Sequence, residues 1–81
     1  MQKRTEKEKL KIAIEFLAFE FDVFDNGNGT YSFEHHLYGW IDIFPALNSI
    51  KIRNQPYYIR NGLDFLKRRV ISFNLDEIFK N

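Results

Sequence analysis

The stretch from Asp25 to His36, DNGNGTYSFEHH, contains oxygen-bearing side chains at a spacing that resembles a calcium-binding loop. An EF-hand loop requires an acid at position 1, oxygen donors at positions 3 and 5, glycine at position 6 and a bidentate glutamate at position 12. With Gly29 at position 6, position 1 is Phe24 and position 12 is His35. The two most strongly charged ligands are missing, so the sequence predicts an Asn/Gly hairpin turn without a metal.

Glu34, His35 and His36 form a second group of metal-ligating residue types. Neighbouring residues of a strand point to opposite faces, so the two histidines are predicted not to share an ion. Zinc normally takes three or four protein ligands, whereas only Glu34 and His36 would lie on the same face. The sequence therefore predicts a buried His35, a solvated His36, and no metal or other cofactor.

Enzyme motifs are missing from the chain, which has no glycine-rich phosphate loop, nucleophile elbow, HExxH sequence or cysteine. Ser32, Ser49 and Ser72 have no histidine and acid at positions that would indicate a catalytic triad. Asp22 and Glu34 could act as paired carboxylates, but nothing distinguishes them from solvated strand residues. We therefore expect a protein that is not an enzyme.

Charge is strongly segregated along the chain, although the net charge is only +1. Residues 12–50 contain six acids and no Lys or Arg, and residues 51–69 contain six bases and one acid. Two candidate partner surfaces follow. The first is an acidic face made of Asp22, Asp25, Glu34 and Asp42. The second is a basic and aromatic face for a partner protein or a nucleic acid, made of Trp40, Lys51, Arg53, Tyr57, Tyr58, Arg60, Lys67, Arg68 and Arg69.

The chain of 81 residues is predicted to form a single domain, 1–81. Its aromatic residues, 17% of the chain, supply the large buried side chains that a small core without disulfides needs. No apolar run approaches the roughly 18 residues of a membrane span, and the first residues are too charged for a signal peptide. We expect a cytoplasmic protein with no membrane partner.

Helical periodicity runs from about Lys3 to Ala18, where Thr5 and Glu8 are placed to form a capping box. A second helix is predicted directly after its N-cap, Asn61, with cations in its last turn. A short helix, Leu75–Phe79, closes the chain. The segment between the first two helices is therefore left to form strands.

In that segment the apolar period changes to two, which predicts four strands in two hairpins. In the first hairpin, a strand at Phe19–Val23 joins a strand at Thr30–Leu37 through a three-residue loop containing a glycine bulge. This loop places Val23 opposite Phe33, whereas a two-residue loop would place it opposite Ser32. Register should follow the apolar face, which favours the three-residue loop.

The second hairpin has a four-residue loop that begins at Pro45 and aligns the isoleucines of its two strands on one face. The other face is predicted to pair Asp42 with Lys51 in a salt bridge and Trp40 with Arg53 in a cation–π contact. The predicted fold is α+β, in the order α-β-β-β-β-α. It is an antiparallel meander of two hairpins with a helix at each end, both packed on one face of the sheet.

The segment WIDIFPALNSIKIRNQPYYIRNGLDFLKRRV resembles the C-terminal half of small phage and mobile-element accessory proteins of unknown function. A strand ending in an aromatic–Pro pair, a basic strand and a glycine-led helix carry the likeness, at Ile41–Pro45, Ile50–Arg53 and Gly62–Val70. Residues 46–49, Ala-Leu-Asn-Ser, stand where the family's turn has Ser-Thr-Gly-Lys. The resemblance implies an accessory protein that interferes with a host system, including anti-CRISPR-like inhibitors, and it transfers no functional residues.

The sequence as a whole predicts a small stoichiometric binding module whose partner is a host protein or a nucleoprotein complex. The alternative is a protein that binds nucleic acid directly through the basic segment 51–69. The sequence leaves open whether the acidic or the basic face makes the contact. It also leaves open the oligomeric state, since an exposed edge strand is compatible with a homodimer.

Overall fold

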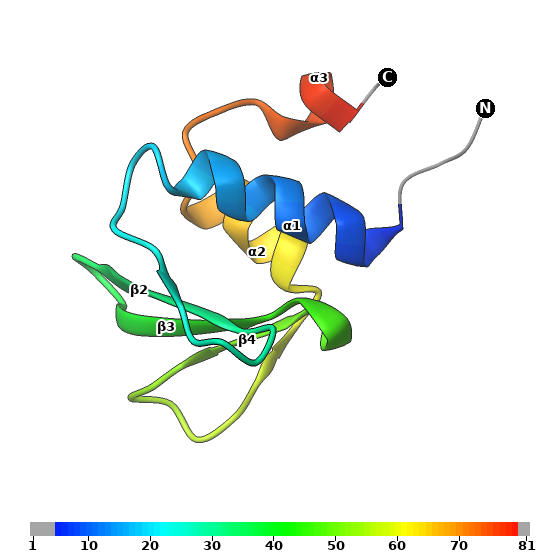
Figure 1. Ribbon diagram of the computed structural model, residues 1–81. Coiled ribbons are helices and arrows are strands. Elements are labelled where there is room, and N and C mark those ends of the chain that lie inside the picture. Colours follow the sequence, from blue (N-terminus) through cyan, green and yellow to red (C-terminus); the bar gives the residue numbers. More distant parts are fainter. Residues whose placement is uncertain (1–4, 80–81) are drawn as a thin grey trace.

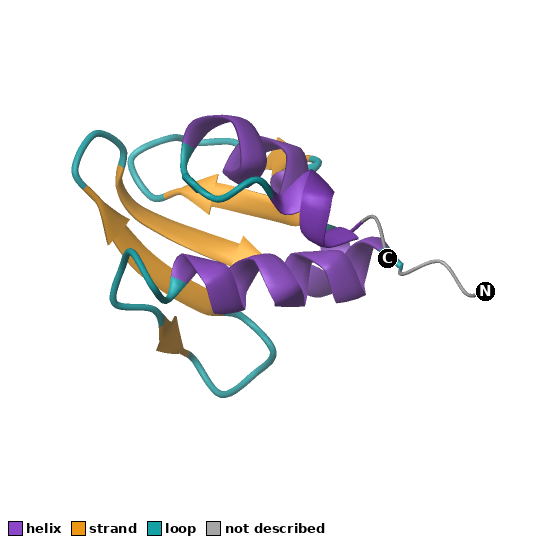
Figure 2. Ribbon diagram, turned by 90° about the horizontal axis from the view of Figure 1, so that it is seen from above, coloured by secondary structure: helices purple, strands orange, loops and turns teal. Residues whose placement is uncertain are grey.

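The computed structural model describes residues 5–79, and in this part of the chain five antiparallel strands form a sheet with helices on one face (Figure 1). The elements are α1 (Glu6–Leu17), β1 (Phe24–Asp25), β2 (Tyr31–His35), β3 (Gly39–Phe44), the 3-10 turn η1 (Pro45–Leu47), β4 (Ser49–Ile52), β5 (Ile59–Arg60), α2 (Gly62–Arg69) and α3 (Leu75–Phe79). The strands follow chain order across the sheet. The predicted α+β meander, with its helices on one face, is confirmed with one additional strand (Figure 2).

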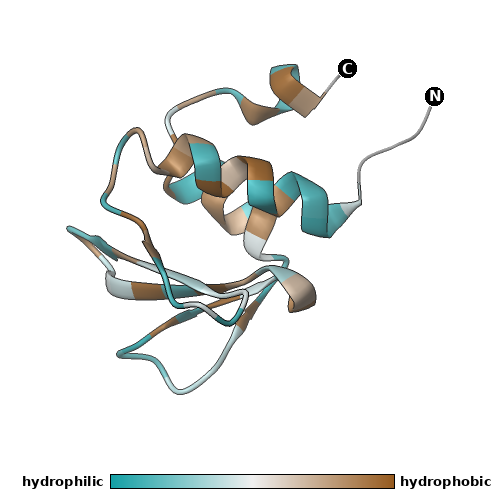
Figure 3. Ribbon diagram, viewed as in Figure 1, coloured by the Kyte–Doolittle hydropathy of each residue, from teal (hydrophilic) through white to brown (hydrophobic). Residues whose placement is uncertain are grey.

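Helix α1 begins with the predicted capping box. Thr5 Oγ1 accepts a hydrogen bond from the Glu8 N–H (3.1 Å), and the Glu8 carboxylate accepts one from the Thr5 N–H (3.2 Å). The part of the predicted helix at residues 3 and 4 lies outside the described residues. Hydrophobic and hydrophilic residues alternate along α1 (Figure 3), which gives it one face for the core. The buried residues on that face are Leu10, Ala13, Ile14 and Leu17.

A hydrophobic core fills the space between the helices and the sheet. Its buried members are Leu10, Ala13, Ile14, Leu17, Phe33, Ile41, Ile43, Ile50, Ile52, Leu63, Leu66, Ile71 and Leu75. At the start of α2, a Cβ on Gly62 would lie 2.9 Å from Cγ2 of Ile50 and 3.1 Å from the backbone carbon of Ser49. Because glycine has no Cβ, the helix can approach β4 this closely. The contact holds α2 against the sheet.

The β3–β4 hairpin has the predicted register, with Ile41 opposite Ile52 and Ile43 opposite Ile50. Its loop begins at Pro45, as predicted. Strand β5 pairs antiparallel with β4 and is not among the predicted strands. A strand of two residues is too short to show an alternating pattern, so periodicity gives no signal for it.

The β1–β2 hairpin has the predicted three-residue loop, closed by a hydrogen bond from the Asn26 N–H to the Thr30 carbonyl (3.0 Å). Phe24 lies opposite Ser32. This register is the predicted one, because the same alignment extended by one residue sets Val23 opposite Phe33. The alignment by the apolar face is therefore confirmed.

The chain between α1 and β1 is a turn, so the prediction that the strand begins at Phe19 is wrong. The N–H groups of Glu20 and Phe21 donate to the carbonyl of Leu17 at 3.0 and 2.9 Å, and Phe19 is 77% exposed. These N–H groups satisfy the end of α1 and are unavailable to a ladder with β2. Phe21 still packs its ring against Phe33, with 5.1 Å between centroids.

Strand β2 ends at His35, earlier than the predicted Leu37, because His35 pairs with Gly39 across a tight turn. His35 Nδ1 accepts hydrogen bonds from the N–H groups of Leu37 (3.0 Å) and Tyr38 (3.4 Å). His35 is buried and His36 exposed, as predicted. The prediction that the two rings point to opposite faces is wrong. They stack with centroids 4.5 Å apart, because His36 lies in the turn and not in the strand.

Candidate binding surface on the open face of the sheet

The face of the sheet that the helices of residues 5–79 leave uncovered carries side chains from all five strands. Cross-strand partners point to the same side of a sheet. Ser32 lies opposite Phe24 in β1 and opposite Asp42 in β3, which fixes this side along each strand. We call it the open sheet face. Its side chains are those of Phe24, Ser32, Glu34, Trp40, Asp42, Phe44, Ser49, Lys51, Arg53 and Arg60.

An ion pair between Asp42 and Arg53 lies at the centre of the open sheet face. Arg53 donates from Nη2 to Oδ1 (2.9 Å) and from Nε to Oδ2 (3.0 Å), and Ser32 Oγ donates to Oδ1 (2.7 Å). The hydrogen bonds from Arg53, followed by the bond from Ser32 and the positive charges of Arg53 and Lys51, lower the pKa of Asp42 below its ordinary value despite partial burial. Asp42 is thus held ionised.

The predicted salt bridge between Asp42 and Lys51 is replaced by this pair. Lys51 lies directly opposite Asp42 in the ladder, but the ion pair is formed with Arg53. A guanidinium presents a fork of donors that reaches both carboxylate oxygens, which a single ammonium cannot match. Side-chain geometry, and not the register alone, therefore selects the partner.

Arg53 also stacks on Trp40, as predicted. Its guanidinium carbon lies 4.9 Å from the centroid of the indole, and its backbone N–H donates to the Trp40 carbonyl (3.0 Å). Such a contact contributes about 0.5–1 kcal/mol at an exposed site. The stacking on Trp40 and the ion pair with Asp42 together hold the side chains of Arg53 and Trp40 in one arrangement at the middle of the face.

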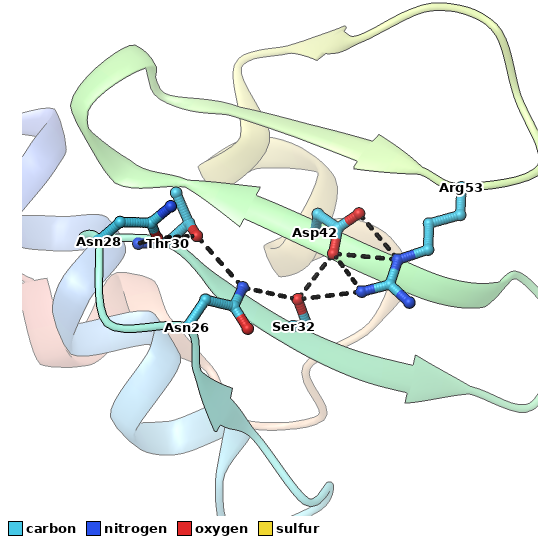
Figure 4. Close-up of polar contacts among 6 residues, drawn as sticks. All are labelled: Asn26, Asn28, Thr30, Ser32, Asp42 and Arg53. Carbon is cyan, nitrogen blue, oxygen red and sulfur yellow. Dashed lines mark hydrogen bonds and ion pairs between the residues drawn. The ribbon is translucent and has the colours of Figure 1, made fainter.

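A chain of hydrogen bonds joins the ion pair to the β1–β2 loop (Figure 4). Asn26 Nδ2 donates to Ser32 Oγ (2.9 Å) and to Thr30 Oγ1 (3.2 Å), and Thr30 Oγ1 donates to Asn28 Oδ1 (2.6 Å). Asp25 Oδ1 accepts a backbone N–H within the loop (2.8 Å). The oxygens that resemble calcium ligands therefore close the hairpin turn. Over residues 5–79, no three His, Cys, Asp or Glu side chains are grouped to hold a metal.

The structure brings together three of the four residues predicted to form the acidic face. Glu34 and Asp42 belong to the open sheet face, and Asp22 joins them just before β1. Asp25 lies one residue after Phe24 on β1, so it falls on the alternate side and serves the loop. Within residues 5–79, neither Asp22 nor Glu34 has an ion pair. A pocket of about 230 Å³ is lined by Asp22, Phe24, Glu34 and Trp40.

The predicted basic residues are divided between two layers of the molecule. Lys51 and Arg60 lie in strands of the sheet and Arg53 directly follows β4, all three on the open face. The other three lie on α2, in the helical layer (Figure 1). Two of these are ion-paired, Lys67 with Asp76 and Arg68 with Asp64, and the third is Arg69. The six bases therefore do not form one continuous patch.

Aromatic side chains lie along the open sheet face. The rings of Phe24 and Trp40 have centroids 5.9 Å apart, and Phe44 meets Tyr58 edge-to-face at 5.4 Å. Tyr57 and Tyr58 are 58% and 55% exposed, next to the β5 edge, and Phe24 is 53% exposed. The tryptophan and both tyrosines are among the predicted surface residues, but the two phenylalanines are not. For Phe44, alternation with the buried Ile43 in step with Asp42 is the signal that could have found it, whereas Phe24 lies in a two-residue strand that is exposed throughout.

Comparison of the chain with protein-family models, with curated proteins and with solved structures gave no match. The resemblance of the C-terminal half to phage and mobile-element accessory proteins therefore stays a prediction. None of the helices within residues 5–79 has both the length and the apolar character that a membrane span requires.

Proposed function

We propose that the protein is a stoichiometric, non-enzymatic binding module that docks a partner protein through the open sheet face. One observation carries the proposal: residues of the two predicted surfaces meet on one uncovered face. Glu34 lies towards the β1 edge, Lys51 and Arg60 lie towards the β5 edge, and the ion pair lies between them. The acidic and basic alternatives become two halves of one surface.

The composition of this face supports a protein partner. Protein interfaces are enriched in Trp, Tyr, Phe and Arg at their centres and carry polar groups at their rims. Here Trp40 and Arg53 are held together at the centre, and exposed rings such as Phe24 and Tyr58 flank them. Large rings left in water on a sheet face are typical of an interaction surface.

Charge complementarity then describes the partner. The partner presents bases to the β1–β2 half of the open sheet face and acids to the β4–β5 half, because like charges that face each other at an interface cost several kcal/mol. The resemblance to phage and mobile-element accessory proteins suggests a class: a host protein, or a protein of a nucleoprotein complex, in the cytoplasm. In that setting the module acts as an inhibitor of the anti-CRISPR-like kind.

Direct nucleic-acid binding is the second candidate, and the exposed tyrosines beside Arg60 favour it. Two features weigh against it on this face. Asp42 already neutralises Arg53, and the carboxylate of Glu34 repels phosphates. We therefore place protein binding first.

Capture from a host lysate with matched charge reversals tests the proposal. The sheet variant is Lys51→Glu/Arg60→Glu, and the control is Arg68→Glu/Arg69→Glu on α2, which changes the net charge equally. We expect the wild type and the control to retain a protein in stoichiometric amount and the sheet variant to lose it. No captured protein, or loss with the control alone, contradicts the proposal. Salt-dependent binding of labelled DNA or RNA would instead support the second candidate.

A further inference from the structure

The pocket at the β1–β2 side of the open sheet face combines the groups that recognise a guanidinium. Two carboxylates, Asp22 and Glu34, and two aromatic rings, Phe24 and Trp40, line about 230 Å³. We propose that this pocket receives an arginine side chain of the partner protein. The inference rests on the proposed function and names one of its contacts.

The aromatic half of the pocket is formed from strands on either side of β2. Phe24 comes from β1 and Trp40 from β3, and their rings approach to 5.9 Å between centroids with planes inclined by 46°. Glu34, on the strand between, lies directly opposite Trp40. A cation within about 6 Å of a ring centroid is attracted by the negative face of the ring. The rings therefore provide apolar walls that favour a cation.

The carboxylate half of the pocket has no counter-ion among the described residues, 5–79. Asp22, which precedes β1, and Glu34, in β2, line the same pocket. Two negative charges in one pocket repel each other. Neither carboxylate has an ion pair within residues 5–79, and residues 12–50 contain no Lys or Arg. A cation from outside would relieve this repulsion.

The chain itself shows the same chemistry on the other side of Trp40. Arg53, the residue after β4, stacks on the indole at 4.9 Å while its guanidinium donates to Asp42 at 2.9 Å. The pocket lies towards β1 and β2, so Trp40 stands between the two positions. A partner arginine would repeat the arrangement of a stacked guanidinium bound to a carboxylate. Arginine suits it better than lysine, because its planar fork binds carboxylates bidentately and stacks on rings.

The test uses Trp40, the single tryptophan of the chain, as its reporter. The indole N–H resonance of the ¹⁵N-labelled protein is followed by NMR during titration with acetyl-Gly-Arg-Gly-amide. Matched peptides carry lysine, or citrulline, which keeps the shape of arginine without its charge. We expect a saturable shift with the arginine peptide, several-fold weaker binding of the lysine peptide and no saturable shift with citrulline.

Two variants locate the site. Glu34→Gln removes a carboxylate of the pocket and should weaken binding of the arginine peptide about 1.5- to fivefold, the range expected for one exposed ion pair. Asp25→Asn is the matched control, a carboxylate of the same hairpin outside the pocket, and should leave the affinity unchanged. If Glu34→Gln does not fold, Asp22→Asn serves the same purpose from outside the strands.

The outcomes separate this inference from the proposed function. Equal binding of the citrulline or lysine peptide, or no effect of the Glu34→Gln and Asp22→Asn variants, overturns the arginine pocket. A partner affinity unchanged by Glu34→Gln, combined with loss of capture by Lys51→Glu/Arg60→Glu, overturns the pocket and leaves the docking face. Selective arginine binding without any captured protein supports the pocket and contradicts the proposed function.

Discussion

The ion pair between Asp42 and Arg53 should contribute measurably to stability, and a double-mutant cycle isolates its contribution. The four proteins are the wild type, Asp42→Ala, Arg53→Ala and the double variant. The interaction energy is the part of the stability change that the single variants do not explain additively. The cycle removes effects that each single change has by itself, such as the loss of the stacking on Trp40 with Arg53→Ala.

The expected interaction energy is about 1 kcal/mol at pH 7. Fully exposed ion pairs contribute about 0.2–1 kcal/mol, and breaking a buried pair costs about 3–5 kcal/mol. Here the side chain of Asp42 is 20% exposed and that of Arg53 is 50% exposed, with two bonds of 2.9 and 3.0 Å. The half-exposed arginine is screened by solvent, so the value belongs near the top of the surface range.

The pH dependence gives an independent check. The folded protein lowers the pKa of Asp42 from 3.8, so the stabilisation is present above pH 3.8 and is lost as the pH falls through the folded pKa. Urea unfolding followed by far-UV circular dichroism should give an interaction energy of about 1 kcal/mol at pH 7 and a smaller one at about pH 2. An interaction energy near zero at pH 7, or one unchanged at the lower pH, refutes the reasoning.

Three further changes probe the fold. Burial, and then the charge of His36, lower the pKa of His35 below 6.5. The free energy of unfolding should therefore fall as the pH drops from 6.5 through the folded pKa. A His35 pKa of 6.5 or more in an NMR titration would contradict this. Gly62→Ala places a Cβ 2.9 Å from Cγ2 of Ile50 and should lower the free energy of unfolding in urea by about 1–3 kcal/mol. An unchanged free energy would show that α2 can shift freely and would contradict this. Asn61→Ala removes the N-cap of α2 and places a side chain with a Cβ at a φ of 55°. Thermal unfolding should show a loss of stability of about 1–2 kcal/mol, larger than that of Asn61→Gly. Equal losses for the two variants would contradict this.

Alternation of apolar residues was sufficient to predict most of the sheet. It aligned Ile43 with Ile50 and set Val23 towards Phe33, because a slip by one residue would turn each buried side chain to water. It failed at Phe19, because the N–H groups of Glu20 and Phe21 donate to the carbonyl of Leu17 at the end of α1 and not to a neighbouring strand. The pattern of apolar residues does not show which of these two sets of hydrogen bonds forms.

The charged residues and the tryptophan of the candidate surface were predictable individually, but the surface as a whole was not. Trp40 and Arg53 share a face by register, which sequence reveals. The separation of Lys67, Arg68 and Arg69 from the sheet depends on where α2 docks, and that contact rests on Gly62 meeting β4. The sequence therefore offered an acidic and a basic surface as alternatives, whereas the fold joins parts of both on one face.

The most direct test of the central claim is hydroxyl-radical footprinting of the protein, free and in complex with its captured partner. Exposed rings lie on both layers. Phe24 belongs to the open sheet face and Tyr58 contacts Phe44 of that face, whereas Phe19 and Phe73, which contact each other at 6.0 Å, lie beside the helices. We predict that the complex protects Phe24, Trp40 and Tyr58 from oxidation and leaves Phe19 and Phe73 unchanged. Protection of Phe19 and Phe73, with unchanged oxidation of the sheet rings, would contradict docking through the open sheet face.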